Sequence, residues 1–315
     1  MDKLANPRHV MWSIRGERVD AVLLDQAQRW VLERLMREYK VNQPPFRGGS
    51  WHEHFAAIYL VSDPGIACIL TVTIQTAYAL AKYGGGELKR FVPHLIGEAE
   101  PIMYGATWFT EIQGGGDLGA NLTKAVRIGD SWRLSGSWKY FTSNAGLADV
   151  ALVTARPEGA PPGVKVGLFL VPRTRPDGSA NFTIRRLKLK SATKSVPTGE
   201  VEFNDAVAYP VGELEKGIYY VLEDLRFSRL ANSAGALGIA RKAFLEALGY
   251  TRFRRAFGKK LIEHPLVVHD LLEMELLIDG GLALMFKAVQ EFQSVSDEVP
   301  PTSRVSHHSD MGRNE

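Results

Sequence analysis

The hydrophobic period of this sequence changes twice along the chain, and no other feature constrains the fold as strongly. Apolar residues first recur every three or four positions, as on one face of a helix. They then form short alternating or continuous runs bounded by glycine and proline, which are typical of strands, before the helical period returns. The sequence therefore predicts an α+β fold with a helical domain over residues 1–100, a β domain over 101–212 and a helical domain over 213–293.

The first helical part contains three predicted helices. An amphipathic helix is expected over Val22–Met36, a second from Asp63-Pro64 to Gly84, and a short one over Glu87–Leu95. The stretch 65–81 carries no charge, but threonine and glutamine interrupt it, and it is short for a membrane span of about 20 residues. We therefore expect a buried helix and no membrane span.

The middle part has the periodicity of strands. Residues Trp132–Trp138 and Glu200–Phe203 alternate between apolar and polar side chains, whereas Val150–Val153 and Val166–Val171 are continuous apolar runs. Because no helical pattern separates these runs, we expect an antiparallel sheet or a small antiparallel barrel.

The last helical part consists of two long predicted helices, Leu230–Ala247 and Leu266–Phe292. Four glycines within them would let helices approach closely: Gly235, Gly238, Gly280 and Gly281. Residues 294–315 are rich in Ser, Pro, His, Asp and Arg and contain no aromatic residue, so we expect a disordered tail.

Composition excludes several classes of protein. With 45% apolar residues the bulk of the chain is not disordered, and 38 Lys and Arg against 35 Asp and Glu leave a charge of only +3. That charge is too small for a protein that coats nucleic acid. The one cysteine, Cys68, forms neither an intrachain disulfide nor a thiolate zinc cluster. Since the first residues also lack the apolar stretch of a secretory signal, we expect a cytoplasmic protein.

Several motifs have more than one interpretation. Gly114–Gly119 matches the dinucleotide pattern G-x-G-x-x-G, but the strand-like alternation of Ala120–Ile128 after it favours a glycine loop between strands, where backbone amides approach a ligand. The triplet His52-Glu53-His54 offers metal-ligand types without an identifiable third ligand, so we expect no metal site. No nucleophile elbow, P-loop or H-E-x-x-H motif occurs.

Two basic clusters contain no acidic residue and are interpreted either as solvated faces or as phosphate contacts of a nucleotide, a coenzyme or DNA. The first comprises Arg185, Arg186, Lys188, Lys190 and Lys194. The second comprises Arg252, Arg254, Arg255, Lys259 and Lys260. An aromatic residue, Phe257, lies within the second cluster, where a ring and a guanidinium could enclose a phosphate-bearing group.

Three ordered segments together resemble the acyl-CoA dehydrogenase superfamily of FAD flavoproteins. Thr110–Asp117 is similar to its flavin-loop motif T-E-x-x-x-G-S-D, Gly136–Asn144 to its second flavin segment, and Arg254–Lys259 to its R-x-x-F-G-K. The glutamine at Gln113, the phenylalanine at Phe141 and the segments 171–173, 176–178 and 265–269 resemble the alkylation-response AidB-type branch. The resemblance implies a helical domain, a middle β-barrel-like domain and a helical bundle, and we expect the bundle to be incomplete at the carboxy-terminal side.

The resemblance implies α,β-dehydrogenation of an acyl-CoA thioester, in which a carboxylate takes the α proton and FAD accepts the β hydride. Thr110 would hydrogen-bond the flavin ring from the loop 108–110, Phe141 and Ser143 would lie on its other side, and Arg254 and Phe257 would reach the FAD of a neighbouring subunit. The implied cofactor residues are Trp108, Thr110, Gly115, Gly116, Asp117, Phe141, Ser143, Arg254 and Phe257. Gly116 departs from the motif because the family has serine there.

Substrate contacts carried over from the family fall on Leu225, Arg226 and Arg229. The catalytic base is not identifiable: in most branches it lies on a later loop, and in a minority branch it corresponds to Ser228, whose hydroxyl needs an activating partner. The acids nearest the matched segments are Glu111, Glu223 and Glu275, and none has a counterpart in the family.

The implied partners are an acyl-CoA substrate, a second copy of the chain that shares FAD across the interface, and an electron-acceptor flavoprotein. DNA binding is not expected, because the DNA-contacting region of the AidB-type branch lies beyond the matched segments. Two alternatives remain open at this point: a non-catalytic flavin- or CoA-binding protein, and a DNA-alkylation-response protein of the same fold.

Overall fold

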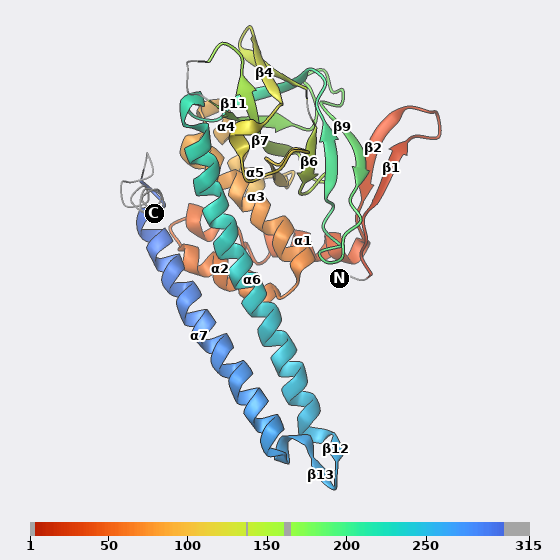
Figure 1. Cartoon of the computed structure of the whole chain (residues 1–315). Coiled ribbons are helices and arrows are strands. Elements are labelled where there is room, and N and C mark those ends of the chain that lie inside the picture. The colour runs from red at the N-terminus through yellow and green to blue at the C-terminus, as the bar shows by residue number, and fades with distance from the viewer. Residues whose placement is uncertain (1–3, 137, 161–164, 299–315) are drawn as a thin grey trace.

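The computed structural model describes residues 4–136, 138–160 and 165–298, and these residues have the predicted order of helices, strands and helices. In Figure 1 the strands of the middle part lie at one end of the molecule, the first helices pack below them, and two long helices extend away as an arm. The predicted α+β class is therefore confirmed for the described residues.

The first helical part begins with a β-hairpin that the sequence analysis missed. Strands β1 (Arg8–Trp12) and β2 (Arg18–Leu23) pair antiparallel, with Val22 opposite His9. The predicted helix over Val22–Met36 is therefore wrong at its start: α1 spans Gln26–Arg37. The Asp25 side chain accepts a hydrogen bond from the Ala27 amide and caps the helix there, whereas Val22 belongs to a strand.

Helices α2 (Trp51–Val61) and α3 (Pro64–Tyr83) follow, preceded by a short 3-10 turn, Pro44–Phe46. As predicted, Asp63 caps α3: its carboxylate accepts from the amides of Gly65 and Ile66. The α3 helix is long and apolar enough to cross a membrane, but 83% of its apolar window is buried inside the protein, as expected of a core helix.

The short helix predicted over Glu87–Leu95 is divided in two, α4 (Gly86–Lys89) and α5 (Val92–Leu95). Pro93 lies in the first turn of α5, and a proline has no amide hydrogen with which to continue a preceding helix. The prediction of one continuous helix is therefore wrong.

The middle part is largely a barrel. A six-stranded sheet has the order β3-β7-β4-β5-β11-β8, and β8 also pairs with β7, so that the sheet closes on itself. A separate three-stranded sheet has the order β6-β10-β9. The strands of the two sheets are β3 Gly105–Trp108, β4 Lys124–Ile128, β5 Ser131–Ser135, β6 Lys139–Thr142, β7 Val150–Pro157, β8 Gly167–Pro172, β9 Thr183–Leu187, β10 Gly199–Glu202 and β11 Ala206–Pro210.

Two details of the strand predictions are wrong. The barrel is not wholly antiparallel, because β7 runs parallel to both β3 and β4. The predicted strand Trp132–Trp138 is interrupted at Gly136, whose φ of +117° suits glycine and turns the chain from β5 of one sheet toward β6 of the other.

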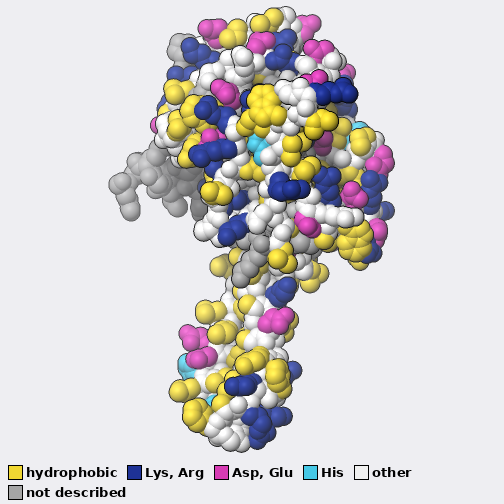
Figure 2. All heavy atoms as spheres, turned by 90° about the vertical axis from the view of Figure 1, so that its right-hand side faces the viewer, with side chains coloured by type: hydrophobic (Ala, Val, Ile, Leu, Met, Phe, Trp, Pro, Cys, Tyr) yellow, Lys and Arg dark blue, Asp and Glu magenta, His cyan; other side chains and the backbone are white. Residues whose placement is uncertain are grey.

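The arm consists of α6 (Gly217–Phe253) and α7 (Pro265–Val295), joined at its tip by the small hairpin of β12 (Arg255–Ala256) and β13 (Lys259–Lys260). Both helices extend beyond their predicted bounds. Figure 2 shows yellow apolar side chains along the arm and dark-blue basic ones at its tip. The large apolar side chains of these two helices and their hairpin that are exposed are Tyr219, Leu222, Ile239, Leu245, Tyr250, Phe253, Phe257, Leu266, Leu272, Met274, Leu276, Leu277 and Leu284.

Two of the four arm glycines allow close packing, as predicted. A Cβ on Gly238 would lie 2.1 Å from the carbonyl oxygen of Tyr59 in α2, and one on Gly281 would lie 2.8 Å from Leu237. Gly235 and Gly280 have no atom within 4 Å of such a Cβ, so the prediction is wrong for them. Of the predicted disordered tail, Ser294 and Val295 belong to α7, and residues 299–315 lie outside the described residues.

Candidate functional site

Two segments predicted to contact a flavin lie side by side in the structure. The first follows β3 and contains Thr110, and the second is β6 with the residues after it. The amide of Tyr140 donates to the carbonyl of Thr110 at 2.9 Å, and Nε1 of Trp108 donates to the carbonyl of Ser143 at 2.7 Å. The structure therefore brings Thr110, Phe141 and Ser143 into one region, as the sequence predicts.

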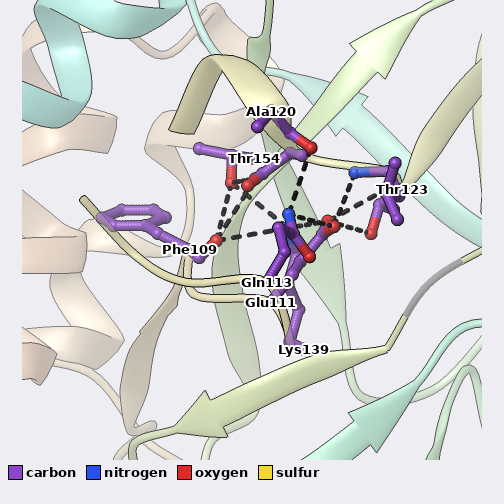
Figure 3. Close-up of polar contacts among 9 residues, drawn as sticks. Phe109, Glu111, Gln113, Ala120, Thr123, Lys139 and Thr154 are labelled. Atoms are coloured by element: carbon purple, nitrogen blue, oxygen red, sulfur yellow. Dashed lines mark hydrogen bonds and ion pairs between the residues drawn. The ribbon is translucent and has the colours of Figure 1, made fainter. Parts of the chain in front are cut away.

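A buried ion pair holds these two segments together. Nζ of Lys139 in β6 lies 2.8 Å from Oε1 of Glu111, and both side chains are completely buried. Figure 3 shows the Glu111 carboxylate pointing toward the Lys139 amine and Thr123. The carboxylate also accepts from the amide of Leu122 at 2.6 Å and from the hydroxyl of Thr123 at 2.6 Å. The buried charge of Glu111 is thus balanced by Lys139, and hydrogen bonds from Leu122 and Thr123 replace its contacts with water.

The pair also shifts both acid–base equilibria. Burial raises the pKa of the Glu111 carboxyl, but Lys139 and the hydrogen bonds from Thr123 and Leu122 outweigh burial and lower it to about 2. Burial lowers the pKa of the Lys139 amine to about 8, against the opposing effect of Glu111. Glu111 is therefore ionised and fully engaged at neutral pH, so it is a structural acid and not a candidate base.

The glycine loop follows directly. Gly114 has a φ of +136°, and its amide and the Glu111 carbonyl close a tight turn. A Cβ on Gly115 would lie 2.5 Å from the hydroxyl of Thr110, so this position requires glycine for the loop to fold against Thr110. Gly116 and Asp117 are exposed, and a Cβ on Gly116 would meet no atom within 4 Å. The loop therefore presents backbone amides to solvent beside Thr110.

Phe141 is 51% exposed although it lies in a strand. A large exposed ring beside Thr110 offers a flat apolar face to a planar ligand. Ser143 is partly buried, and its hydroxyl donates to the carbonyl of Thr107 at 3.4 Å. Together with the glycine loop these residues fit a flavin, because they combine an apolar face, hydroxyl groups and exposed amides.

Trp108 does not fit its predicted role. It lies within β3 and not in a loop, and its side chain is completely buried. The indole packs in the barrel core, with its ring centre 4.9 Å from that of Phe182, and its only polar atom is engaged by Ser143. The Trp108 side chain therefore holds the backbone of Ser143 in place and has no exposed surface with which to contact a ligand.

Arg254 and Phe257 lie at the tip of the arm, at the opposite end of the molecule from β3 and β6 (Figure 1). Phe257 is 97% exposed and Arg254 is also exposed. Arg254 and Phe257 therefore do not reach Thr110 of the same chain. They could contact a flavin cofactor only if Thr110 and the other flavin residues of a second molecule hold it.

The first basic cluster is not a free phosphate site. Arg186 and Lys188 in and after β9 both contact the carboxylate of Glu200, at 2.9 and 2.7 Å. Glu200 belongs to β10, which pairs with β9. Lys190 donates to the Val196 carbonyl and the Thr198 hydroxyl. The acidic partner comes from the neighbouring strand, which the local sequence could not indicate.

The predicted substrate residues lie on α6 where it faces α3 and the barrel. Leu225 packs on the apolar cluster that includes Phe109, the residue before Thr110. Arg226 is partly buried, and burial lowers the pKa of its guanidinium, whereas Arg229 is exposed. Leu225 therefore packs on the cluster next to the flavin segments, Arg226 is partly enclosed, and Arg229 faces solvent.

Two buried polar residues between these helices were not predicted from the sequence. Nε2 of Gln75 in α3 donates to the carboxylate of Asp224 in α6 at 2.7 Å, and both side chains are buried. The hydroxyl of Ser228 donates to Oε1 of Gln75 at 3.4 Å. The signal available was an acid between apolar residues of α6, Asp224, and a glutamine, Gln75, inside the uncharged stretch 65–81 of α3.

The two other acids considered have structural partners. Glu223 is buried and accepts hydrogen bonds from Tyr78, Lys82 and Tyr83, which joins α3 to α6. Glu275 lies 4.0 Å from Arg241 on the neighbouring helix of the arm. Neither therefore provides an unengaged carboxylate near Thr110.

Within the described ranges no group of three or more His, Cys, Asp or Glu side chains could hold a metal ion. His54 is fully buried in α2, and its Nδ1 lies 2.9 Å from the carbonyl of Val41. Burial lowers the pKa of His54 to about 4, so the ring is neutral at physiological pH.

Comparisons with known proteins give the family. The model of the acyl-CoA dehydrogenase middle domain matches residues 106–206, and that of the acyl-CoA dehydrogenase C-terminal domain matches residues 215–305. The chain belongs to the acyl-CoA dehydrogenase superfamily. The two matches correspond to the barrel with its flavin segments and to the arm, so the predicted resemblance and the acyl-CoA dehydrogenase fold are confirmed.

Individual relatives agree with this assignment. The AidB protein of Escherichia coli is 29% identical over 94% of the chain, in accordance with the predicted branch. Caenorhabditis elegans ACDH-11, solved in complex with C11-CoA, has a TM-score of 0.84 and 25% identity over 94% of the chain. Butyryl-CoA dehydrogenase of Megasphaera elsdenii has a TM-score of 0.77 and 25% identity over 86%. The chain spans 57% of AidB and 53% of ACDH-11.

Proposed function

We propose that this protein is an FAD-dependent oxidoreductase that dehydrogenates an acyl-CoA thioester between its α and β carbons. The observation that carries the proposal is the pairing of two flavin-motif segments by the buried Glu111–Lys139 ion pair, beside an exposed Phe141 and an open glycine loop. Membership of the acyl-CoA dehydrogenase superfamily supports it.

The residues of one chain would hold the flavin end of FAD. Phe141 would pack on the ring, Thr110 and Ser143 would hydrogen-bond its polar edge, and the amides of Gly115 and Gly116 would face its pyrophosphate. Gly116 provides no hydroxyl at the position where the family has serine. When bound, FAD supplies the acceptor for the hydride that leaves the β carbon.

The substrate would lie between the flavin segments and α6, next to Leu225 and Arg226. The described residues provide no evident catalytic base: Glu111 and Glu223 are engaged, and the Ser228 hydroxyl donates to the amide of Gln75, which cannot take a proton from it. The proposed reaction therefore requires that a carboxylate from another part of the protein, or from another chain, take the α proton.

A second copy of the chain would complete the cofactor site. Arg254 and Phe257 at the tip of the arm are exposed and lie far from Thr110 of the same chain (Figure 1). The apolar side chains exposed along the arm provide a surface for such an association. We further propose an electron-accepting flavoprotein as partner and the cytoplasm as the location.

One experiment tests the reaction. The purified protein is examined for a bound-flavin spectrum and then titrated anaerobically with straight-chain acyl-CoA thioesters of increasing length. Bleaching of the flavin by at least one of them is expected. A flavin that no thioester bleaches would contradict dehydrogenation and favour a non-catalytic flavin-binding protein, and absence of flavin from the reconstituted protein would contradict both.

A matched pair of variants tests the shared site. Arg254→Ala is expected to weaken FAD retention in gel filtration, because it removes a guanidinium available to the pyrophosphate of a neighbouring copy. Arg186→Ala is the control, since its guanidinium is already paired with Glu200. Equal loss of FAD in both variants would contradict the assignment of Arg254.

A further inference from the structure

A buried carboxyl between α3 and α6 has one oxygen without a partner. Asp224 is 1% exposed, and its Oδ2 accepts from Nε2 of Gln75 at 2.7 Å. The same Nε2 lies 2.7 Å from the Asp224 carbonyl, which fixes the carboxyl relative to its own backbone. Oδ1 is buried and has no hydrogen-bond partner among the described residues. Such an atom costs free energy unless something pairs with it.

Asp224 directly precedes the two α6 residues proposed to contact the substrate. Leu225 and Arg226 directly follow Asp224, and Leu225 packs on the cluster of Phe109. Ser228 lies one helical turn further on the same face of α6, is partly exposed, and donates to Gln75. A series of polar groups therefore leads from the partly exposed Ser228 through Gln75 to the buried carboxyl.

The environment of Asp224 defines what could pair with it. Burial raises the pKa of this carboxyl well above its ordinary value, against the hydrogen bond from Gln75, and the charge of Glu223 raises it further. A neutral carboxyl can donate a hydrogen bond as well as accept one. Among uncharged groups a hydroxyl both donates and accepts, so it complements Oδ1 in either protonation state.

We propose that Asp224 is a specificity-determining residue that selects acyl-CoA thioesters bearing a hydroxyl group on the acyl chain, beyond the two reacting carbons. This inference rests on the proposed function and adds the substrate class. Gln75 is the positioning residue, because it holds Oδ2 and leaves Oδ1 available. A plain hydrocarbon chain would leave Oδ1 unpaired, and sites built to pair a substrate hydroxyl discriminate strongly against analogues that lack it.

The test compares ligands of one chain length. The full 315-residue chain, loaded with FAD, is titrated calorimetrically with hexanoyl-CoA and with its 4-, 5- and 6-hydroxy derivatives. At least one hydroxylated isomer is expected to bind about tenfold or more tightly than hexanoyl-CoA. Equal binding of all four would overturn this inference and leave the proposed function intact, whereas binding of none would contradict both.

Substitutions of Asp224 test whether this residue causes the preference for hydroxylated acyl-CoA thioesters. Asp224→Leu is expected to abolish the preference while keeping the affinity for hexanoyl-CoA, because it removes the polar atom at similar volume. Asp224→Asn retains a donor and an acceptor and is expected to keep a preference. Glu275→Gln on the arm is the control and should bind all four like the original chain. A preference retained in Asp224→Leu would overturn the inference, and the wild-type ligand series decides it if that variant does not fold.

Discussion

The amine of Lys139 lies 2.8 Å from the carboxylate of Glu111, and neither side chain reaches solvent. The two residues come from separate segments, and each of these segments carries a residue proposed to hold FAD. Lys139 also lies 3.3 Å from the Thr154 hydroxyl in β7, so the pair ties both segments to the barrel. The ion pair therefore fixes the distance between Thr110 and Phe141.

Breaking this pair from one side should be costly. Glu111→Gln or Lys139→Met leaves the other charge buried without a counter-ion, and each is expected to lower the free energy of unfolding by about 3–5 kcal/mol. FAD retention should fall in parallel. Urea denaturation of the two single variants and of the double variant measures the effect. The double variant should lose less than the sum of the two losses, and strict additivity would show that the residues do not interact.

The glycine loop allows a comparison of adjacent positions. Gly115→Ala places a Cβ 2.5 Å from the Thr110 hydroxyl and is expected to cost about 1–3 kcal/mol and to weaken flavin binding. Gly116→Ala meets no atom within 4 Å and should change stability by less than about 0.5 kcal/mol. Thermal denaturation and flavin titration of both variants test this. A larger effect at Gly116 than at Gly115 would contradict the loop conformation.

Two glycines of α6 should respond in opposite directions. Gly238→Ala places a Cβ 2.1 Å from the Tyr59 carbonyl and is expected to destabilise the packing of α6 on α2 by about 1–3 kcal/mol. Gly235→Ala has open space and should stabilise the helix by about 0.5–1 kcal/mol, since alanine loses less backbone entropy. Denaturant midpoints compare the two. Stabilisation by both substitutions would refute the close contact with α2.

His54 should make stability dependent on pH in the acid range. Its pKa is about 4 in the folded protein and 6.5 ordinarily, so the unfolded chain binds the proton more readily. Its contribution is fully present above pH 6.5 and is lost as the pH falls toward 4, a loss of about 3 kcal/mol. The measurement is the free energy of unfolding against pH for the original chain and for His54→Gln. Identical pH dependence in both would exclude His54 as the cause.

The sequence predicted the order of the three parts, the cap of α3 and the meeting of Thr110 with Phe141 and Ser143, because periodicity and matched motifs are local signals. It did not predict the β1–β2 hairpin, since the apolar run Val22, Leu23 and Leu24 at the end of β2 is continuous with the apolar pattern of α1. It also gave Trp108 a ligand contact, although burial of a side chain depends on the packing of distant strands.

Contacts between residues that are distant in the chain could not be predicted from the sequence either. Arg186 and Lys188 of the first basic cluster pair with Glu200 because β9 and β10 are neighbours, a relation set by the register of two strands. Asp224 and Gln75 lie 149 positions apart in the chain and meet only because α3 packs on α6. Contacts of this kind follow from tertiary structure and have no signature in a window of neighbouring residues.

The length of the continuous α6 helix sets the distance between the two regions of the chain proposed to contact FAD, the barrel segments and the tip of the arm. Its first turns carry Asp224 and Leu225 beside the barrel, and its last residue precedes Arg254 at the tip. At about 1.5 Å per residue its 37 residues span roughly 55 Å, so the length of this one helix fixes how far a partner copy must reach. One inserted residue in its middle would turn Arg254 by about 100° away from that partner, whereas four would nearly restore its direction and lengthen the arm by about 6 Å.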